Sequence, residues 1–238
     1  MMKIGILLVG RASEDLVGKY GTYAEMLIAL INSEEQVFEF KTFNILDDEF
    51  PKDHLECDGW IVTGSPHGVY EEHSWIPTVS QLVNDIYKAN LPIFGVCFGH
   101  QLIAQALGGH VEKSKKGWGL GLHTYQVNNK PDYMSNLSEE VTLNICHQDQ
   151  VLRPPQGATV YAKSKFCENA GFYIKDKVLT MQAHPEFLVD FIKALLTARR
   201  DVTIPKEFVD PALVGLNNNS DSVESNQFAE TIRRFFLN

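Results

Sequence analysis

The sequence is poor in positive charge: 21 lysines and arginines stand against 30 aspartates and glutamates, a formal net charge of −9 over 238 residues. Binding to nucleic acid or to an anionic lipid surface requires a basic face. The charge balance argues against both, so we expect neither nucleic acid nor a membrane as a partner.

Long apolar runs are also missing. No apolar segment approaches the roughly 20 residues that a membrane-spanning helix needs. The initial run MMKIGILLVG is followed at once by Arg11, Glu14 and Asp15, without a small-residue cleavage site. We therefore expect no signal peptide and a cytoplasmic protein.

Cysteine is scarce, and no two of the four cysteines form a C-x-x-C pair; they are Cys57, Cys97, Cys146 and Cys167. Apolar residues make up 44% of the chain, enough for a large core without disulfides. We expect reduced thiols, among which an unusual cysteine is catalytic rather than cross-linked.

Cofactor motifs are absent too. No phosphate loop of the form GxxxxGK[ST] and no G-x-G-x-x-G follows an apolar strand. A metal site could be drawn from Cys97, His100 and His184, but no ligand pair has zinc spacing. We predict no cofactor and no metal.

The first hundred residues alternate apolar strands with amphipathic helices. Strands are predicted at 3–10, 36–45, 59–66 and 91–96, and helices at 21–32, 76–90 and 99–109. This alternation with short connections predicts an α/β fold with a doubly wound, mostly parallel sheet.

After Val111 short strands follow one another without long helices between them. They are predicted at 120–127, 140–146, 157–164, 169–175 and 177–185, as an antiparallel lobe added to the same domain. A helix at 186–200, a turn-rich connector at 215–222 and a last helix at 223–238 with Ser222 as N-cap complete the chain. We predict a single domain, 1–238, in which 217–238 is a helical extension packed on its own domain.

The stretch GVCFGHQ, residues 95–101, places one cysteine between a predicted strand and a predicted helix. This is the layout of a nucleophile elbow, in which Gly95 and Gly99 allow close backbone approach. Cys97 would lie at the carboxyl end of a central strand and at a helix N-terminus, which favours a thiolate. A buried, inert cysteine is the alternative that this context leaves open.

A base for that nucleophile is available in MQAHPEF, residues 181–187. Pro185 biases His184 towards an extended conformation at the end of a predicted strand. Glu186 stands close enough to accept a hydrogen bond from the imidazole and fix its tautomer, the third role in a catalytic triad.

Together, GVCFGHQ and QAHPEF resemble the class I glutamine amidotransferases, which carry G-[VI]-C-x-G-[HM]-Q and H-P-E. The resemblance covers roughly residues 1–200 and implies a flavodoxin-like sheet with a small added antiparallel sheet. The segments Thr63–Pro66, Val69–Tyr70 and Trp75 are similar to TGSP…VY…W in a free-standing subgroup, which is close to the GMP synthase amidotransferase domain and the gamma-glutamyl peptidases.

The resemblance implies hydrolysis of a γ-glutamyl amide bond. Cys97 would attack the γ-carbonyl, His184 would move the proton, Glu186 would orient His184, and water would hydrolyse the thioester. Backbone N–H groups of Ser65 and Phe98 would form the oxyanion hole. Relatives often have glycine in place of Ser65, so the shape of the hole is an open point.

The resemblance also implies a set of substrate contacts: Gly64, Gln101, His147, Gln148 and Asp149. For Gln148 and Asp149 we expect backbone atoms to make the contact. Gln148 departs from the family's frequent H-G at this segment. His100 is expected to begin a helix rather than to catalyse, because the family tolerates methionine there.

The leaving group stays open. The chain carries no ATP-pyrophosphatase signature such as S-G-G-x-D-S. Either a separate synthase subunit accepts the ammonia from glutamine, or the protein is a stand-alone hydrolase of γ-glutamyl peptides such as glutathione conjugates. A non-catalytic module with the same fold is disfavoured by the intact triad. Lys113, Lys115 and Lys116 form either a solvated loop or a basic patch that attracts a carboxylate-bearing substrate.

Overall fold

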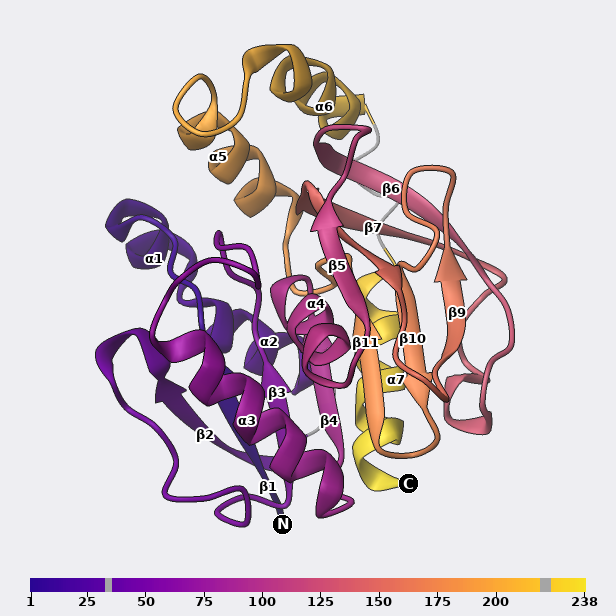
Figure 1. Ribbon diagram of the computed structural model, residues 1–238. Coiled ribbons are helices and arrows are strands. Elements are labelled where there is room, and N and C mark those ends of the chain that lie inside the picture. Colours follow the sequence, from indigo (N-terminus) through magenta and orange to yellow (C-terminus); the bar gives the residue numbers. More distant parts are fainter. Residues whose placement is uncertain (33–35, 219–223) are drawn as a thin grey trace.

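A sheet of nine strands runs through the computed structural model, with helices on both faces (Figure 1). The structure describes residues 1–32, 36–218 and 224–238. The strands are β1 (Met2–Leu8), β2 (Phe38–Asn44), β3 (Gly59–Val62), β4 (Ile93–Val96), β5 (His110–Lys113), β6 (Gly119–Val127), β7 (Glu140–His147), β8 (Asp149–Arg153), β9 (Thr159–Lys163), β10 (Gly171–Ile174) and β11 (Val178–Met181). The helices are α1 (Glu14–Tyr20), α2 (Tyr23–Ile31), α3 (Trp75–Lys88), α4 (Phe98–Ala106), α5 (Val189–Arg199), α6 (Lys206–Asn218) and α7 (Ser225–Leu237).

The order of strands across the sheet confirms the predicted fold class. It is β2-β1-β3-β4-β11-β10-β9-β6-β7. The first five strands are parallel, in the flavodoxin-like order, and the last four continue the sheet in antiparallel fashion. The expected small antiparallel sheet is present as β5 paired with β8.

One grouping of strands from the sequence is wrong. The strand predicted at 177–185 was assigned to the antiparallel lobe, whereas β11 pairs with β4 in parallel and completes the parallel half of the sheet. All four residues of β11 are buried, as expected for a central strand. Strand pairing is decided by contacts far apart in the chain, which a local pattern does not report.

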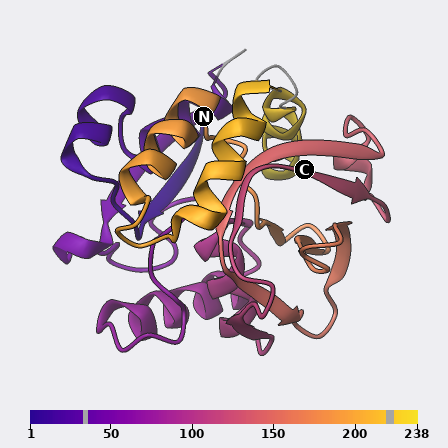
Figure 2. The ribbon, with the colours of Figure 1, turned by 90° about the horizontal axis from the view of Figure 1, so that it is seen from above.

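Two apolar clusters cover the two faces of the sheet. Residues of β1 enter both of them, Ile4, Ile6 and Leu8 on one side and Leu7 on the other. The first cluster packs against α2, α5 and α7, and the second against α3 and α4. Seen from above, α5 and α6 lie side by side (Figure 2).

The C-terminal third differs from the sequence prediction in one helix. Residues 215–218 of the predicted connector form the last turn of α6, and the rest of that connector, with Ser222, lies outside the described residues. Pro211 and Gly215 have low helix propensity, so the local sequence does not predict this helix. Burial of Val209 and Leu216 against the rest of the chain compensates.

Helix α7 packs on its own chain, as predicted. Phe228, Ile232, Phe235 and Phe236 are buried in the first apolar cluster, next to α2. All four cysteines are free and buried. Among the described residues, no helix has the length and apolar character to cross a bilayer.

Candidate active site

The backbone at Cys97 is strained. This residue joins β4 to α4 with φ 50° and ψ −102°, a region that residues with a side chain rarely adopt. Its N–H donates to the carbonyl of Met181 on the neighbouring strand β11, at 2.8 Å. Conformations of this kind cost on the order of 1–3 kcal/mol and are concentrated at functional sites. The observed turn is the elbow that the sequence predicts.

The two glycines of the elbow are required by close backbone contacts. A β-carbon on Gly99 would lie 2.2 Å from the carbonyl oxygen of Val62, on β3. One on Gly95 would lie 2.6 Å from the carbonyl oxygen of Gly99. Real β-carbons do not approach this closely, so only glycine lets the strand, the turn and the helix meet here.

His184 is held on several sides after β11. Its backbone N–H donates to the carbonyl of Asn144 on β7 at 2.8 Å, and its ring stacks on Phe187 at a centroid distance of 3.8 Å. Nδ1 lies 2.7 Å from Oε1 of Glu186, and the ring lies beside Cys97. The side chains of His184 and Glu186 are only 5% and 0% exposed. The three predicted triad residues therefore lie together, with Glu186 hydrogen-bonded to His184 and Cys97 beside the ring.

Charge sets the protonation state of His184. Burial alone would lower its pKa, but the neighbouring Glu186 carboxylate and Cys97 outweigh burial and raise the pKa to about 10. The imidazole is therefore protonated at neutral pH. Burial raises the pKa of the other three thiols, that of Cys57, that of Cys146, and that of Cys167 to about 12.

Two backbone N–H groups adjoin the thiol. Neither the N–H of Ser65, in the loop after β3, nor that of Phe98, the first residue of α4, has an acceptor among the described residues. The Ser65 hydroxyl accepts from the N–H of His67 at 3.3 Å, so this side chain takes part in a local turn. A β-carbon on the preceding Gly64 would lie 2.8 Å from Cε1 of His184. Glycine at 64 thus allows the loop to approach the imidazole.

Cys97 faces a cavity of about 150 Å³ with a largely polar wall. Side chains that line it include Gln101, Lys113, His147, Gln148, Asp149 and Arg199. Four of the five predicted substrate contacts are therefore brought to the cavity. The fifth, Gly64, adjoins it beside Cys97 and His184.

The carbonyls of the predicted contact segment already have partners inside the protein. The carbonyl of Asp149 accepts from Nε2 of Gln101 at 2.9 Å and from Nδ1 of His147 at 3.0 Å. The carbonyl of Gln148 accepts from the N–H of Ser114 at 3.1 Å. The Asp149 carbonyl therefore has both lone pairs occupied, whereas the Gln148 carbonyl keeps one lone pair for a ligand.

His147 lines the cavity and carries a buried acceptor. Burial lowers its pKa to about 3, so the ring is neutral. Since Nδ1–H donates to Asp149, Nε2 carries a lone pair, and this buried atom has no partner among the described residues.

The residues considered for a metal site do not gather around one point. His100 is fully buried, its pKa is lowered to about 3 by burial, and Nδ1 contacts the Thr180 hydroxyl at 2.9 Å. It lies in the first turn of α4, as predicted. Within the described part of the chain, the one group with metal-ligand proximity is His67, Glu71 and His73.

Sequence reasoning missed several residues around the cavity. His67 and Glu71 line its mouth, where Oε2 of Glu71 accepts from His67 at 3.1 Å and from His73 at 2.9 Å. Arg199 reaches the wall from the end of α5. None of these residues belongs to a sequence motif, because the loops and helices that bring them to the cavity come together only in the folded chain.

The lysines of the segment 113–116 differ in whether they reach the cavity. Lys113 lines the cavity. Nζ of Lys116 instead donates to the carbonyls of Lys165 and Phe166, at 2.6 and 3.1 Å. Only one lysine of the three therefore reaches the candidate site.

Comparison with known proteins places this geometry in a family. A family model described as glutamine amidotransferase class-I matches residues 17–193. Gamma-glutamyl peptidase 4 of Arabidopsis thaliana is 34% identical over 180 residues, which is 73% of this chain and 71% of the relative. A glutamine-hydrolysing GMP synthase of Finegoldia magna is 34% identical over 129 residues, 54% of this chain but only 24% of that protein.

The fold agrees. A crystal structure of a glutamine amidotransferase from Thermotoga maritima aligns with a TM-score of 0.79 at 20% identity, covering 100% of this chain and 99% of that one. The chain belongs to the class I glutamine amidotransferase family. It is a cysteine-dependent hydrolase of the γ-glutamyl amide bond.

Proposed function

We propose that Cys97 is the nucleophile of this hydrolase, with His184 as proton carrier and Glu186 as the residue that orients it. The observation that carries this proposal is the buried hydrogen bond between His184 and Glu186, with Cys97 beside the imidazole. It lies at the carboxyl edge of the parallel strands, where open α/β sheets bind ligands.

The reaction follows from these positions. The Cys97 thiolate attacks the γ-carbonyl carbon, and the carbonyl oxygen becomes an oxyanion that accepts from the N–H groups of Ser65 and Phe98. The C–N bond breaks as protonated His184 gives its proton to the leaving amine, which leaves a γ-glutamyl thioester. Water then attacks the thioester, His184 takes a proton from it, and the thiolate is released with glutamate.

Recognition of the γ-glutamyl group is assigned to the wall formed by α4 and the β7–β8 turn. We assign the α-ammonium group to the carboxylate of Asp149, which lines the cavity beside His147. Gly64, Gln101 and Gln148 complete the contacts proposed from the sequence. Because the carbonyl of Asp149 already accepts two hydrogen bonds, this residue makes its contact through its side chain.

Labelling with a glutamine-like diazo-ketone tests the nucleophile. Mass spectrometry is expected to map the adduct to Cys97 in the wild type and to find none in Cys97→Ala, whose thermal unfolding stays cooperative. Cys146 provides the internal control, since it lines the same cavity but burial raises the pKa of its thiol. An adduct on Cys57, Cys146 or Cys167 in place of Cys97 would contradict the proposal.

For the leaving group we propose a stand-alone gamma-glutamyl peptidase. The match to gamma-glutamyl peptidase 4 extends over most of both chains, whereas the match to the GMP synthase is confined to about a quarter of that protein. A glutaminase that passes ammonia to a separate synthase subunit is the second candidate. The substrate in either case is a small molecule, glutamine or another γ-glutamyl compound.

A substrate screen separates these two. We expect the purified chain to turn over a γ-glutamyl peptide faster than glutamine, with kcat/KM as the readout. Rapid glutaminase activity of the isolated chain, or tight copurification with an ATP-using synthase, would favour the second candidate instead.

A further inference from the structure

Arg199 carries a guanidinium group without an anionic partner. Its side chain makes one hydrogen bond among the described residues, from Nη1 to the sulfur of Cys146 at 3.5 Å, and no carboxylate of that part of the chain lies within ion-pair distance. The next residue, Arg200, holds both oxygens of Asp210 at 2.6 and 2.9 Å. A partly buried guanidinium without a counterion is costly, so an anion from outside the chain fits this position.

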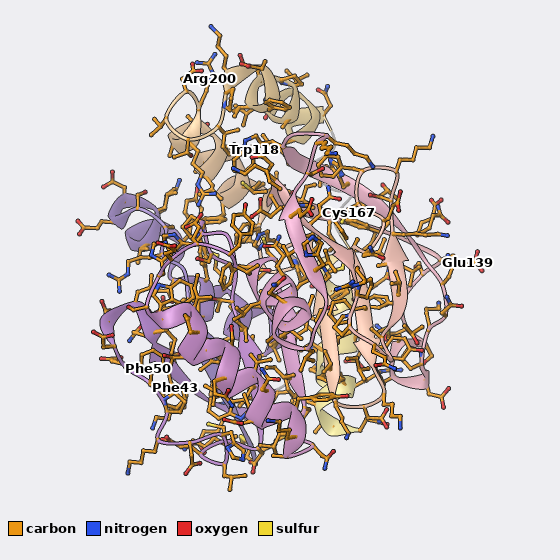
Figure 3. The ribbon with its side chains drawn as sticks, in the orientation of Figure 1. Phe43, Phe50, Trp118, Glu139, Cys167 and Arg200 are labelled. Atoms are coloured by element: carbon orange, nitrogen blue, oxygen red, sulfur yellow. The ribbon has the colours of Figure 1, made fainter. Side chains whose placement is uncertain are left out.

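The backbone under Arg199 is well fixed. Its carbonyl accepts from the N–H groups of Val202, Thr203 and Ile204, at 3.1, 3.0 and 3.0 Å. These bonds close the end of α5 as the chain turns towards α6. The guanidinium is thus presented from an anchored helix end, in contrast to Arg200 on the outer surface at the top of the view in Figure 3.

The position of Arg199 indicates which part of a substrate it meets. It lines the cavity that holds Cys97, and also a small adjoining gap lined by Ser65, His184, Cys146 and Tyr23. In the proposed reaction His184 gives its proton to the leaving nitrogen, so that nitrogen must lie on the His184 side of the thiol. The atoms beyond the leaving nitrogen are therefore on the side of Arg199, and the γ-glutamyl α-carbon is on the side of Gln101 and His147.

We propose that Arg199 binds the carboxylate of the leaving amino acid, and that the preferred substrates are γ-glutamyl peptides with a free carboxylate beyond the scissile bond. This inference rests on the proposed function and deepens it, because it states which leaving groups the site selects. A guanidinium matches a carboxylate with two parallel hydrogen bonds, whereas ammonia released from glutamine offers it nothing.

Lys113 is the other cation that lines the cavity. It belongs to β5 and is exposed, so water screens its charge. Arg199 is half-buried and less screened, so it contributes more to selection among substrates. Lys113 is therefore the alternative residue for binding the carboxylate, and it is tested beside Arg199.

A matched pair of substrates tests the proposal: γ-glutamylglycine and γ-glutamylglycinamide. Glycinamide is the better leaving group of the two, so reactivity alone favours the amide. We expect the wild type to prefer the free acid by at least about tenfold in kcat/KM, the size of one charge-assisted hydrogen bond. Arg199→Gln is expected to lose this preference while its kcat/KM for the amide stays within about threefold of wild type.

Three further variants bracket that result. Arg200→Gln, at the neighbouring position outside the cavity, is expected to keep the full preference, and Lys113→Gln to keep most of it. Arg199→Lys retains the charge without the planar fork and is expected to keep part of the preference.

Several outcomes would overturn the inference. A wild type that cleaves both substrates equally contradicts it without touching the proposed function, and that measurement needs no variant to fold. An equal loss on both substrates in Arg199→Gln would place the arginine on the γ-glutamyl side. Loss of the preference for the free acid in Lys113→Gln, but not in Arg199→Gln, would show that the lysine binds the carboxylate. Cleavage of neither substrate by the wild type would contradict the proposed function as well.

Discussion

At the scale of single residues, the site is governed by the charge that surrounds His184. Its pKa is raised to about 10 because the influence of Glu186 and Cys97 exceeds that of burial. The ring therefore stays protonated through the neutral range and loses its proton only in alkaline solution. Because the protonated ring gives its proton to the leaving amine, activity is expected to fall as the pH rises through the pKa of His184.

Glu186→Gln tests this balance. Loss of the carboxylate charge removes the largest influence that raises the pKa of His184, so burial pulls the pKa down and the alkaline limb of kcat/KM moves to lower pH. We also expect at least a tenfold loss of kcat/KM at neutral pH, since the ring loses its charged partner. The readout is the pH profile on one γ-glutamyl peptide. A limb at the wild-type position would show that Glu186 does not set the protonation of His184.

At the scale of elements, the site exists because the ends of several strands meet. β3 leads to Ser65, β4 to Cys97 and β11 to His184, while β7 supplies the carbonyl that holds the backbone of His184. The loop after β3 comes so close to the imidazole that Gly64 has no room for a side chain. The spacing of these loops is thus part of the catalytic geometry.

Gly64→Ala is expected to lower kcat/KM by about a hundredfold, because a misplaced proton carrier loses its alignment with the reacting atoms. The added methyl would lie 2.8 Å from Cε1 of His184 and displace the ring. Gly18→Ala is the matched control: this glycine lies within α1 with open space around it. Its activity is expected to stay at the wild-type level, with stability raised by about 0.5–1 kcal/mol. Full activity of Gly64→Ala would show that the contact is not limiting.

At the scale of the whole molecule, an arrangement can be predicted from the sequence when the interacting residues are close together in the chain. The elbow around Cys97 and the pair His184–Glu186 are local in the chain, so their glycines, proline and spacing are readable as a pattern. The parallel pairing of β11 with β4 and the approach of Arg199 to the cavity join residues about a hundred positions apart. No local pattern carries that information, and α6 with its internal proline is stabilised only by its burial against other elements.

The turn at Cys97 has a consequence for the stability of the chain. A residue with a side chain at φ 50° stores unfavourable energy that the rest of the fold must offset. Selection for the nucleophile has therefore kept the protein less stable than its fold allows. The free energy of unfolding of Cys97→Gly is expected to exceed that of Cys97→Ala by about 1 kcal/mol, because glycine adopts this turn without strain. Chemical denaturation of these two inactive variants measures the difference, and equal stabilities would mean that the turn is not strained. A higher free energy of unfolding for Cys97→Gly would measure the stability that the strained turn costs the enzyme.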